Sequence, residues 1–324
     1  MNRNKRMIGI ACIAALLVLL LGCSQPQQEK APGIRVGFSH AEVVNPWRMA
    51  QINSLRQNME AAGCEFIYTE PLERTQQWQL NNIRQMLDEG LDFLFLIPLD
   101  TEGYEEIAEQ AKVCGTQVIS LGQALDGLTS GEDYLSCIYY DYALAGRLCG
   151  QTLAQSCRGK TCRVLEIQSG NPSVAQEISD GFQQAVSESR GITVVSRLVA
   201  DGDRIATQKL VEKAIIELLQ QDTMIDAVFA HNDEDGLGAL NALKLAGADL
   251  CSIHIVSING EQDVFKAIIA EEYLASVACS PMLGPIAYDM IRLFLEGHRI
   301  SPYILIPCVL VDNSNARASY FNAY

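Results

Sequence analysis

Polar and aromatic side chains cluster where the first predicted β-strand ends. Asn45, Trp47 and Arg48 follow the apolar run 34–39 and open a segment of helix length. Asparagine is a favoured N-cap and Pro46 suits the first helical position, so helix initiation alone is one interpretation. A tryptophan exposed in that first turn would also offer a flat ring for stacking, while Asn and Arg donate hydrogen bonds to hydroxyl groups. We therefore expect these three residues to contact a small ligand.

Later strands end in similar polar groups. Asn232 and Asp233 follow the apolar run 225–230, where they could simply cap a helix and complement its dipole, each contributing under about 1 kcal/mol. Asn259 precedes a glycine, and a glycine permits close approach of a ligand. Asp141, after the run 135–139, is both a candidate ligand contact and a candidate helix N-cap. Because ligands of open α/β sheets bind at the carboxyl ends of the strands, we expect these side chains to face one crevice.

The sequence lacks the motifs of common nucleotide-dependent and hydrolytic enzymes. It has no G-x-x-x-x-G-K-[ST] phosphate loop, no complete G-x-G-x-x-G after a strand, no G-x-S-x-G elbow and no H-E-x-x-H helix. Its four histidines are scattered, and none has zinc-ligand spacing with cysteine. An enzymatic function would have to rest on the acidic run 233–235 without a nucleophile–base pair. We therefore expect a binding protein that uses neither a metal nor a cofactor.

Short apolar runs alternate with amphipathic segments of helix length along most of the chain. Strict alternation of strand and helix predicts parallel sheets built from right-handed β-α-β units. Eleven strands are too many for one comfortable sheet, so we predict an α/β fold of two Rossmann-like lobes. The predicted strands are 34–39, 64–69, 92–97, 117–121, 135–139, 163–167, 192–198, 225–230, 253–258, 274–279 and 304–311.

The composition narrows the class of partner. Of 324 residues, 48% are apolar and 19% are charged, which is typical of a globular protein, and the length suits two domains. Lys and Arg total 24 against 39 Asp and Glu, which gives a net charge of −15. So acidic a chain repels phosphate backbones, and we expect no nucleic-acid partner.

The N-terminus has the pattern of an export signal. Three basic residues precede the apolar run 7–21, which at 1.5 Å per residue spans only ~22 Å of a ~30 Å hydrocarbon core. The segment 20–23 resembles a bacterial lipobox. We expect residues 1–22 to be a lipoprotein signal peptide, Cys23 to carry a lipid and 23–33 to be a flexible tether; an uncleaved anchor and an ordinary signal are the alternatives. The prediction is an extracytoplasmic protein that meets the cell membrane only through this lipid.

Eleven cysteines bear on the redox state. Cys12 lies in the predicted signal and Cys23 in the lipobox, so nine remain, with no C-x-x-C pair among them. Most fall at apolar positions of predicted strands and helices, so we expect buried free thiols. A disulfide between Cys157 and Cys162 is the alternative that the spacing leaves open.

Several short motifs occur together along the chain. They are Val36-Gly37-Phe38-Ser39 with Asn45-Pro46-Trp47-Arg48, Glu166-Ile167-Gln168, Ala230-His231-Asn232-Asp233, Val256-Ser257-Ile258-Asn259-Gly260, and Gly284-Pro285. In this combination the chain resembles the type I periplasmic binding proteins of the ribose and galactofuranose group, the receptors of sugar ABC transporters. The resemblance covers nearly all of the chain from Ile34 to about Tyr324.

The resemblance implies two lobes joined by three crossing segments, near 139–141, 279–281 and 299–303. It further implies a monomer that closes around a sugar-like small molecule and delivers it to an ABC permease. A receptor of the same fold that presents its ligand to a chemoreceptor or sensor kinase is the alternative. The implied lobes are 34–139 with 281–300, and 140–280 with 301–324.

The resemblance also assigns roles to single positions. Asn45 and Trp47 fall on hydrogen-bonding and stacking positions of the first lobe, and Asn232 falls on a hydroxyl-binding position of the second. Gly122 and Gln123 stand where sugar receptors carry an Asp-Arg pair, so Gln123 is the contact expected there. We therefore expect a sugar-like ligand with fewer hydroxyls or a different charge. The other departures from the family pattern are Ile178 for an Arg, Gly202 for an aromatic residue, Asn259 for a carboxylate and Ala278-Cys279 for a Glu or Gln.

Overall fold

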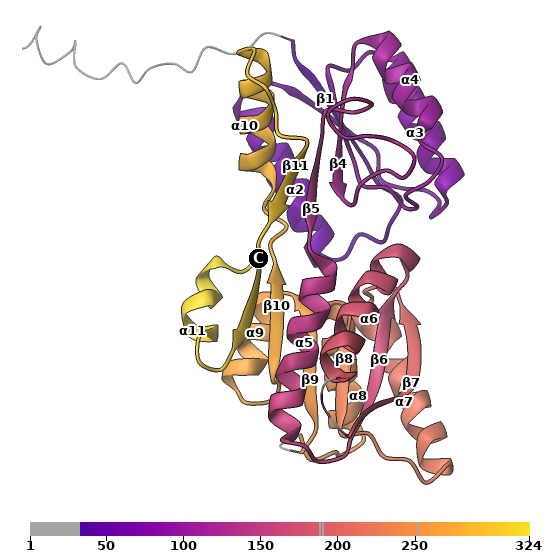
Figure 1. Cartoon of the computed structure of the whole chain (residues 1–324), viewed down its shortest axis with the longest axis vertical. Helices are drawn as coiled ribbons and strands as arrows, with labels where there is room; N and C mark the ends of the chain where they lie inside the picture. Colours follow the sequence, from indigo (N-terminus) through magenta and orange to yellow (C-terminus); the bar gives the residue numbers. More distant parts are fainter. Residues whose placement is uncertain (1–32, 188, 190, 251) are drawn as a thin grey trace, which may run out of the picture.

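Two six-stranded sheets form two lobes that stack end to end (Figure 1). The computed structural model describes residues 33–324 except 188, 190 and 251, so the predicted signal peptide, the lipidation site Cys23 and nearly all of the predicted tether lie outside the described residues. Helices cover both faces of each sheet (Figure 1). The predicted α/β fold of two Rossmann-like lobes is confirmed. No helix in the described part has the length and hydropathy needed to cross a membrane.

The first lobe has the strand order β11-β5-β4-β3-β1-β2, with all neighbours parallel. Near-continuous apolar strands suit a sheet covered on both faces, and β3 is buried along its whole length. The lobe consists of β1 (Arg35–Ser39), α2 (Pro46–Ala61), β2 (Glu65–Tyr68), α3 (Gln76–Asp88), β3 (Phe93–Leu96), α4 (Glu105–Cys114), β4 (Gln117–Gly122), β5 (Ser136–Tyr140), α10 (Gly284–Leu295) and β11 (Tyr303–Ile306).

The second lobe has the strand order β12-β10-β9-β8-β6-β7, and only the β10–β12 pair is antiparallel. Its elements are α5 (Tyr142–Cys157), β6 (Cys162–Ser169), α6 (Pro172–Ser187), β7 (Ile192–Ala200), α7 (Arg204–Gln220), β8 (Ala227–Ala230), α8 (Asp233–Leu245), β9 (His254–Asn259), α9 (Gln262–Ile269), β10 (Ala275–Cys279), β12 (Cys308–Asp312), α11 (Ala316–Ser319) and the 3-10 turn η1 (Tyr320–Asn322).

One predicted strand is two strands in different lobes. The apolar run 304–311 breaks at Pro307, so that β11 pairs with β5 in the first lobe and β12 pairs with β10 in the second. Proline has no N–H to donate to a ladder, which allows the chain to leave one sheet and enter the other there. The third crossing is therefore at 307 rather than at 299–303, and the assignment of all of 301–324 to the second lobe was wrong.

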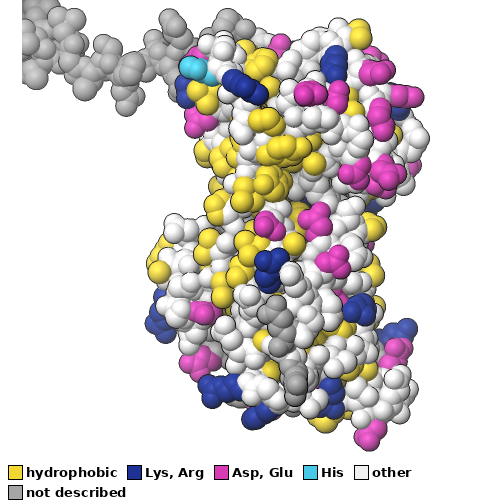
Figure 2. Space-filling view, viewed as in Figure 1, with side chains coloured by type: hydrophobic (Ala, Val, Ile, Leu, Met, Phe, Trp, Pro, Cys, Tyr) yellow, Lys and Arg dark blue, Asp and Glu magenta, His cyan; other side chains and the backbone are white. Residues whose placement is uncertain are grey.

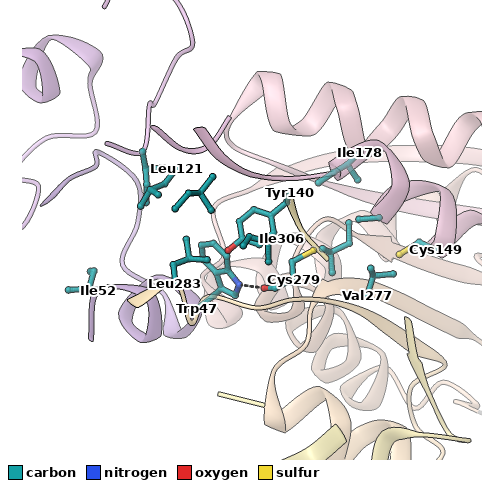
Figure 3. Close-up of a cluster of buried hydrophobic side chains, with 14 of the residues drawn as sticks. Trp47, Ile52, Leu121, Tyr140, Cys149, Ile178, Val277, Cys279, Leu283 and Ile306 are labelled. Carbon is teal, nitrogen blue, oxygen red and sulfur yellow. Dashed lines mark hydrogen bonds between the residues drawn. The ribbon is translucent and has the colours of Figure 1, made fainter. Parts of the chain in front are cut away.

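A continuous hydrophobic core runs through the neck between the lobes. Trp47, Tyr140, Cys279, Leu283 and Ile306 belong to one buried cluster that reaches into both sheets (Figure 3). The molecule narrows at this neck, where apolar side chains also reach the surface (Figure 2). Those exposed on the edge strands β11 and β12 are Tyr303, Leu305 and Val309.

Glycines set the position of α6 beside the neck. A Cβ on Gly146 of α5 would lie 2.0 Å from the Ile178 carbonyl oxygen, and one on Gly181 would lie 1.9 Å from the Ala143 carbonyl oxygen. Real Cβ atoms do not approach an oxygen so closely, so the two helices pack backbone against backbone at these glycines. This packing brings the N-terminal half of α6 to the boundary between the lobes.

Candidate ligand-binding cleft

A cleft of about 330 Å³ lies between the lobes, at the carboxyl ends of the parallel strands. Its volume is at the lower end of the range for small-molecule sites, about 300–1,000 Å³. Side chains from both lobes line it, as expected for a site at the switch point of parallel sheets. Of the eight predicted ligand contacts, six line the cleft: Asn45, Trp47, Arg48, Gln123, Asn232 and Asn259.

Two asparagines from opposite lobes begin helices at the cleft wall. Asn45 Oδ1 accepts the Arg48 N–H at 2.9 Å as the N-cap of α2. Asn232 Oδ1 accepts the Asp235 N–H at 2.8 Å as the N-cap of α8, and its Nδ2 also donates to the Asp235 carboxylate. A Cβ on Gly202 would lie 2.6 Å from Asn45 Nδ2 and 3.8 Å from Asn232 Nδ2. The two amide nitrogens therefore converge from the two lobes around a residue that has no side chain.

Trp47 lies deeper than the sequence suggested. Its side chain is 9% exposed, and its indole Nε1 donates to the Cys279 carbonyl oxygen at 2.7 Å (Figure 3). Tyr140 meets the indole edge-on, with ring centroids 5.9 Å apart. The expectation of an exposed tryptophan was wrong, because the ring fills the core of the neck and its only donor is already bonded. The ring still contributes part of the cleft wall.

Arg48 is a buried cation, and one of its three nitrogens has no hydrogen-bond partner among the described residues. Its side chain is 7% exposed, and its two terminal nitrogens bond Glu42 and Gln51. Its guanidinium carbon lies 5.1 Å from the centroid of the Trp47 ring. The Arg48 Nε has no hydrogen-bond partner among the described residues. An unsatisfied buried donor such as this one costs about 1–3 kcal/mol.

Gln123 and Asn259 enter the cleft from opposite lobes. Gln123 Nε2 lies 3.4 Å from Glu177 Oε1 of α6, so it reaches across the lobe boundary. Asn259 has a φ of 133°, a backbone conformation that side-chain-bearing residues rarely adopt and that costs about 1–3 kcal/mol. The turn at Asn259 directs the next two backbone N–H groups, of Gly260 and Glu261, to the Asp233 carboxylate at 2.7 Å each.

Asp233 and Asp141 do not line the cleft. Asp233 is fully buried inside the second lobe, where it also accepts the hydroxyls of Ser257 and Ser276. Its two oxygens accept four hydrogen bonds that join β9, β10 and α8, so its observed role is to support the second lobe. Asp141 Oδ1 accepts the Leu144 N–H at 2.7 Å as the N-cap of α5 and does not line the cleft.

Several charged, polar and aromatic side chains in the cleft wall were not predicted from the sequence. Most lie in the connections between a strand and the following helix, which the prediction considered at only some strand ends. Three carried a usable signal, because Tyr140 and Tyr142 belong to a run with three tyrosines and His231 directly precedes Asn232. The missed residues are Glu42, Gln51, Arg74, Tyr140, Tyr142, Asn171, Asp201 and His231.

His231 is held as a neutral donor and acceptor behind the cleft. Burial lowers the pKa of His231, and its Nδ1 accepts the Ser169 N–H at 3.3 Å. Its Nε2 therefore carries the hydrogen and donates to Glu166 Oε1 at 3.2 Å. Burial alone would raise the pKa of Glu166, but hydrogen bonds from His231 and Ser179 and the charge of Arg197 bring it to about 2. This network fixes the end of β6 against the end of β8.

Hydrogen bonds and one ion pair join the lobes around the cleft. Asn171 Nδ2 lies 3.3 Å from Glu42 Oε1 and 3.4 Å from the Leu99 carbonyl oxygen of the first lobe. Arg74 and Asp201 form a second bridge, with Nη1 and Oδ2 3.5 Å apart at an exposed edge. Together with the Gln123–Glu177 contact, these interactions connect the two lobes on several sides of the cleft.

Glu261 is a buried acid beside the Asp233 carboxylate. Its side chain is 5% exposed, its Oε1 has no partner among the described residues, and Arg204 lies 3.7 Å from its Oε2. Burial raises the pKa of Glu261, and the negative charges of Asp233 and Glu234 raise it further. Asp233, with four donors around it, carries the charge of the pair, and Glu261 holds a proton at neutral pH.

We expect Glu261→Gln to flatten the pH dependence of stability. An acid whose folded pKa is raised binds more protons in the native state, so wild-type stability falls as pH rises from about 4.5 toward the folded pKa. Glutamine is neutral throughout, so the stability of the variant relative to wild type should increase with pH, by up to about 1.4 kcal/mol per pH unit. Urea denaturation between pH 5 and 9 measures this slope. The exposed Glu60→Gln should follow wild type, and an unchanged slope for Glu261→Gln would mean that Glu261 is ionised.

Comparison with known proteins identifies the family of this chain. A family model described as a periplasmic binding protein domain matches residues 36–299. The chain belongs to the periplasmic binding proteins. The galactofuranose-binding protein YtfQ of Escherichia coli strain K12 is 28% identical over 279 residues, which is 86% of this chain and 87% of that protein.

Solved structures agree with the family assignment. The crystal structure of a galactofuranose-binding protein has a TM-score of 0.82 and 27% identity, and the match covers 89% of this chain and 98% of that one. The periplasmic component of the arabinose ABC transporter from Shewanella sp. ANA-3, bound to α- and β-L-arabinofuranose, has a TM-score of 0.81 and 25% identity over 89% and 95% of the two chains. In the described part of this periplasmic binding protein, no group of three or more His, Cys, Asp or Glu is arranged to hold a metal.

Proposed function

We propose that this protein is an extracytoplasmic receptor that binds a sugar or sugar-like molecule and delivers it to an ABC importer. The observation that carries the proposal is the cleft, in which side-chain amides of both lobes and guanidinium groups of the first lobe converge at the strand ends. Sugar recognition needs many short-range donors and acceptors around a small volume, together with an apolar wall. The relatives named for galactofuranose and L-arabinofuranose support the same class of ligand.

The charge pattern of the cleft favours a neutral ligand. Arg48 is balanced by Glu42, and Arg74 is balanced by Asp201, so the cationic side chains in the wall already have carboxylate partners. His231 is neutral because burial lowers its pKa. The wall therefore offers oriented hydrogen-bond groups without a strong net charge, which suits hydroxyl groups better than a carboxylate or an amine.

A thermal-shift and calorimetric screen tests this function. The purified protein would be tested against pentoses, hexoses, polyols, nucleosides and amino acids, because a bound ligand raises stability by RT ln(1 + [L]/Kd). We expect a sugar or polyol with a Kd in the micromolar range or below. Its binding should be weakened by Gln123→Ala in the cleft and unchanged by Gln110→Ala, which lies outside the cleft on α4. A nucleoside or amino acid as the tightest ligand would overturn the proposal.

Lobe closure gives a second, separable prediction. Asn171 caps α6 through Oδ1 and joins the lobes through Nδ2. Asn171→Asp keeps the cap but replaces the bridging donor with a carboxylate facing Glu42, so we expect about tenfold weaker binding of the sugar found in the screen. Small-angle scattering should show a larger ligand-free radius of gyration, with the exposed Asn81→Asp as the matched control. An unchanged radius and affinity would mean that this bridge does not contribute to closure.

We propose that the protein works as a monomer held to the membrane through lipid on Cys23. The basic residues, the short apolar run and the lipobox-like segment of the first 23 residues support this anchor. In a bacterial host, the wild-type protein should fractionate with membranes and Cys23→Ser should be released or retained unprocessed. Mass spectrometry of the mature N-terminus should find a diacylglyceryl group on Cys23. An unmodified N-terminus at another residue would contradict the anchor and leave the binding function untouched.

A further inference from the structure

Two cysteines face each other where the chain leaves and re-enters the second lobe. Cys279 is the last residue of β10 and Cys308 the first of β12, and they are directly opposite in the antiparallel ladder. Their sulfur atoms are 3.2 Å apart. A disulfide needs a sulfur separation of about 2.0 Å and Cα atoms about 4.4–6.8 Å apart, and opposed antiparallel residues meet the second condition. The sulfurs need to approach by only about 1.2 Å.

The pair lies at the point where the three crossing segments meet. From Cys279 the chain runs through α10 and β11 of the first lobe and returns at Cys308. Cys308 Sγ also lies 3.8 Å from the Asp141 carbonyl oxygen of the first crossing. The Cys279 carbonyl oxygen accepts the Trp47 indole N–H, and Cys279 lines the cleft (Figure 3). A bond between the two sulfurs would therefore form a covalent loop at the hinge. This loop would contain the whole segment 279–308, which includes α10 and β11 of the first lobe.

We propose that Cys279 and Cys308 are a redox modification site, at which a reversible disulfide covalently links two of the three crossing segments. The oxidant is a small organic disulfide or a thiol–disulfide oxidoreductase. The Cys308 thiolate attacks one sulfur of the oxidant and releases one thiolate. The Cys279 thiol then loses its proton, attacks the Cys308 sulfur and releases the second thiolate. In total, two cysteine thiols and one disulfide give one protein disulfide and two small thiols.

The environment of the two thiols suits this order of attack. Cys308 is half-buried, whereas Cys279 is 1% exposed, so an external disulfide reaches Cys308 first. A hydrogen bond from Cys279 lowers the pKa of the Cys308 thiol, and the same contact together with burial raises the pKa of Cys279. The attacking thiol is thus the more accessible of the two and has the larger thiolate fraction, and the resolving thiol is the buried one.

Oxidation of the purified protein with oxidised glutathione tests the proposal. After the remaining thiols are alkylated, non-reducing digestion and mass spectrometry should find a cross-linked peptide that joins Cys279 to Cys308 and has lost two hydrogens. Dithiothreitol should return both peptides to the alkylated form. The oxidised protein should melt about 5 °C higher than the reduced protein, because the bond restricts the unfolded chain.

Serine variants separate this site from the other thiols. Cys308→Ser and Cys279→Ser should each abolish the oxidant-dependent rise in melting temperature, while Cys114→Ser, at an exposed thiol on α4, should keep it. If one hinge variant fails to fold, peptide mapping of the wild-type protein still decides. Alkylation of both cysteines after oxidation, a glutathione adduct that persists on Cys308, or a cross-link confined to Cys157 and Cys162 would overturn the proposal.

Discussion

Replacing Trp47 with alanine is expected to lower the free energy of unfolding of the ligand-free protein by about 3–5 kcal/mol. The indole is 9% exposed, packs against Tyr140 and bonds the Cys279 carbonyl oxygen, so the variant leaves a cavity and an unpaired acceptor in the neck. An exposed tryptophan that only stacked on a ligand would give a different result. Its replacement would abolish ligand binding and leave the melting temperature of the ligand-free protein almost unchanged. Urea denaturation followed by circular dichroism measures the difference.

The second tryptophan provides a matched control for Trp47. Trp78 is half-buried in the first turn of α3 and does not line the cleft, so Trp78→Ala should cost clearly less. Trp47→Phe keeps most of the apolar contact and removes only the indole N–H, so it should cost about 1–3 kcal/mol, the penalty of one unsatisfied buried acceptor. If Trp47→Ala unfolded within about 1 kcal/mol of wild type, the neck would not depend on this ring.

Local sequence patterns were sufficient for the strand ends and the helix caps. Asn45, Asp141 and Asn232 each accept the N–H three residues later, as their types and positions predict. The alternation of strands and helices likewise predicted parallel sheets, and the number of strands predicted two lobes. Features that depend on a few neighbouring residues could therefore be predicted.

Features that depend on distant partners could not be predicted. The direction of the Asp233 side chain is set by Ser257 and Ser276, which lie 24 and 43 residues away in the sequence. Trp47 is buried because Cys279 comes to lie beside it, 232 residues later. In the run 304–311 Pro307 marks a local break, but the pairing of the two halves with β5 and β10 is what shows that they belong to different lobes. Type and spacing alone therefore place a residue at the cleft edge without saying whether it points into the cleft or into the core.

Asp233→Ala is expected to destabilise the second lobe by about 4 kcal/mol or more. The substitution leaves four buried donors without an acceptor, and each such donor costs about 1–3 kcal/mol. The donors are two hydroxyls and two backbone N–H groups, and together they hold β9, β10 and the start of α8 in place. The expected sign is therefore a loss of folding stability, measured by urea denaturation. The exposed Asp180→Ala on α6 should stay within about 0.5 kcal/mol of wild type.

Asp233→Asn distinguishes a supporting carboxylate from a ligand contact. The amide oxygen can still accept the two backbone N–H groups, and the serine hydroxyls can turn to accept from the amide nitrogen, so the loss should be less than half that of alanine. The neutral amide also removes a negative charge beside Glu261, so the pKa of that acid should fall and stability should decline less steeply above neutral pH. A ligand contact would behave in the opposite way. Both variants would then fold as stably as wild type and lose affinity for the sugar found in the screen, and the position of Asp233 inside the lobe would have to be abandoned.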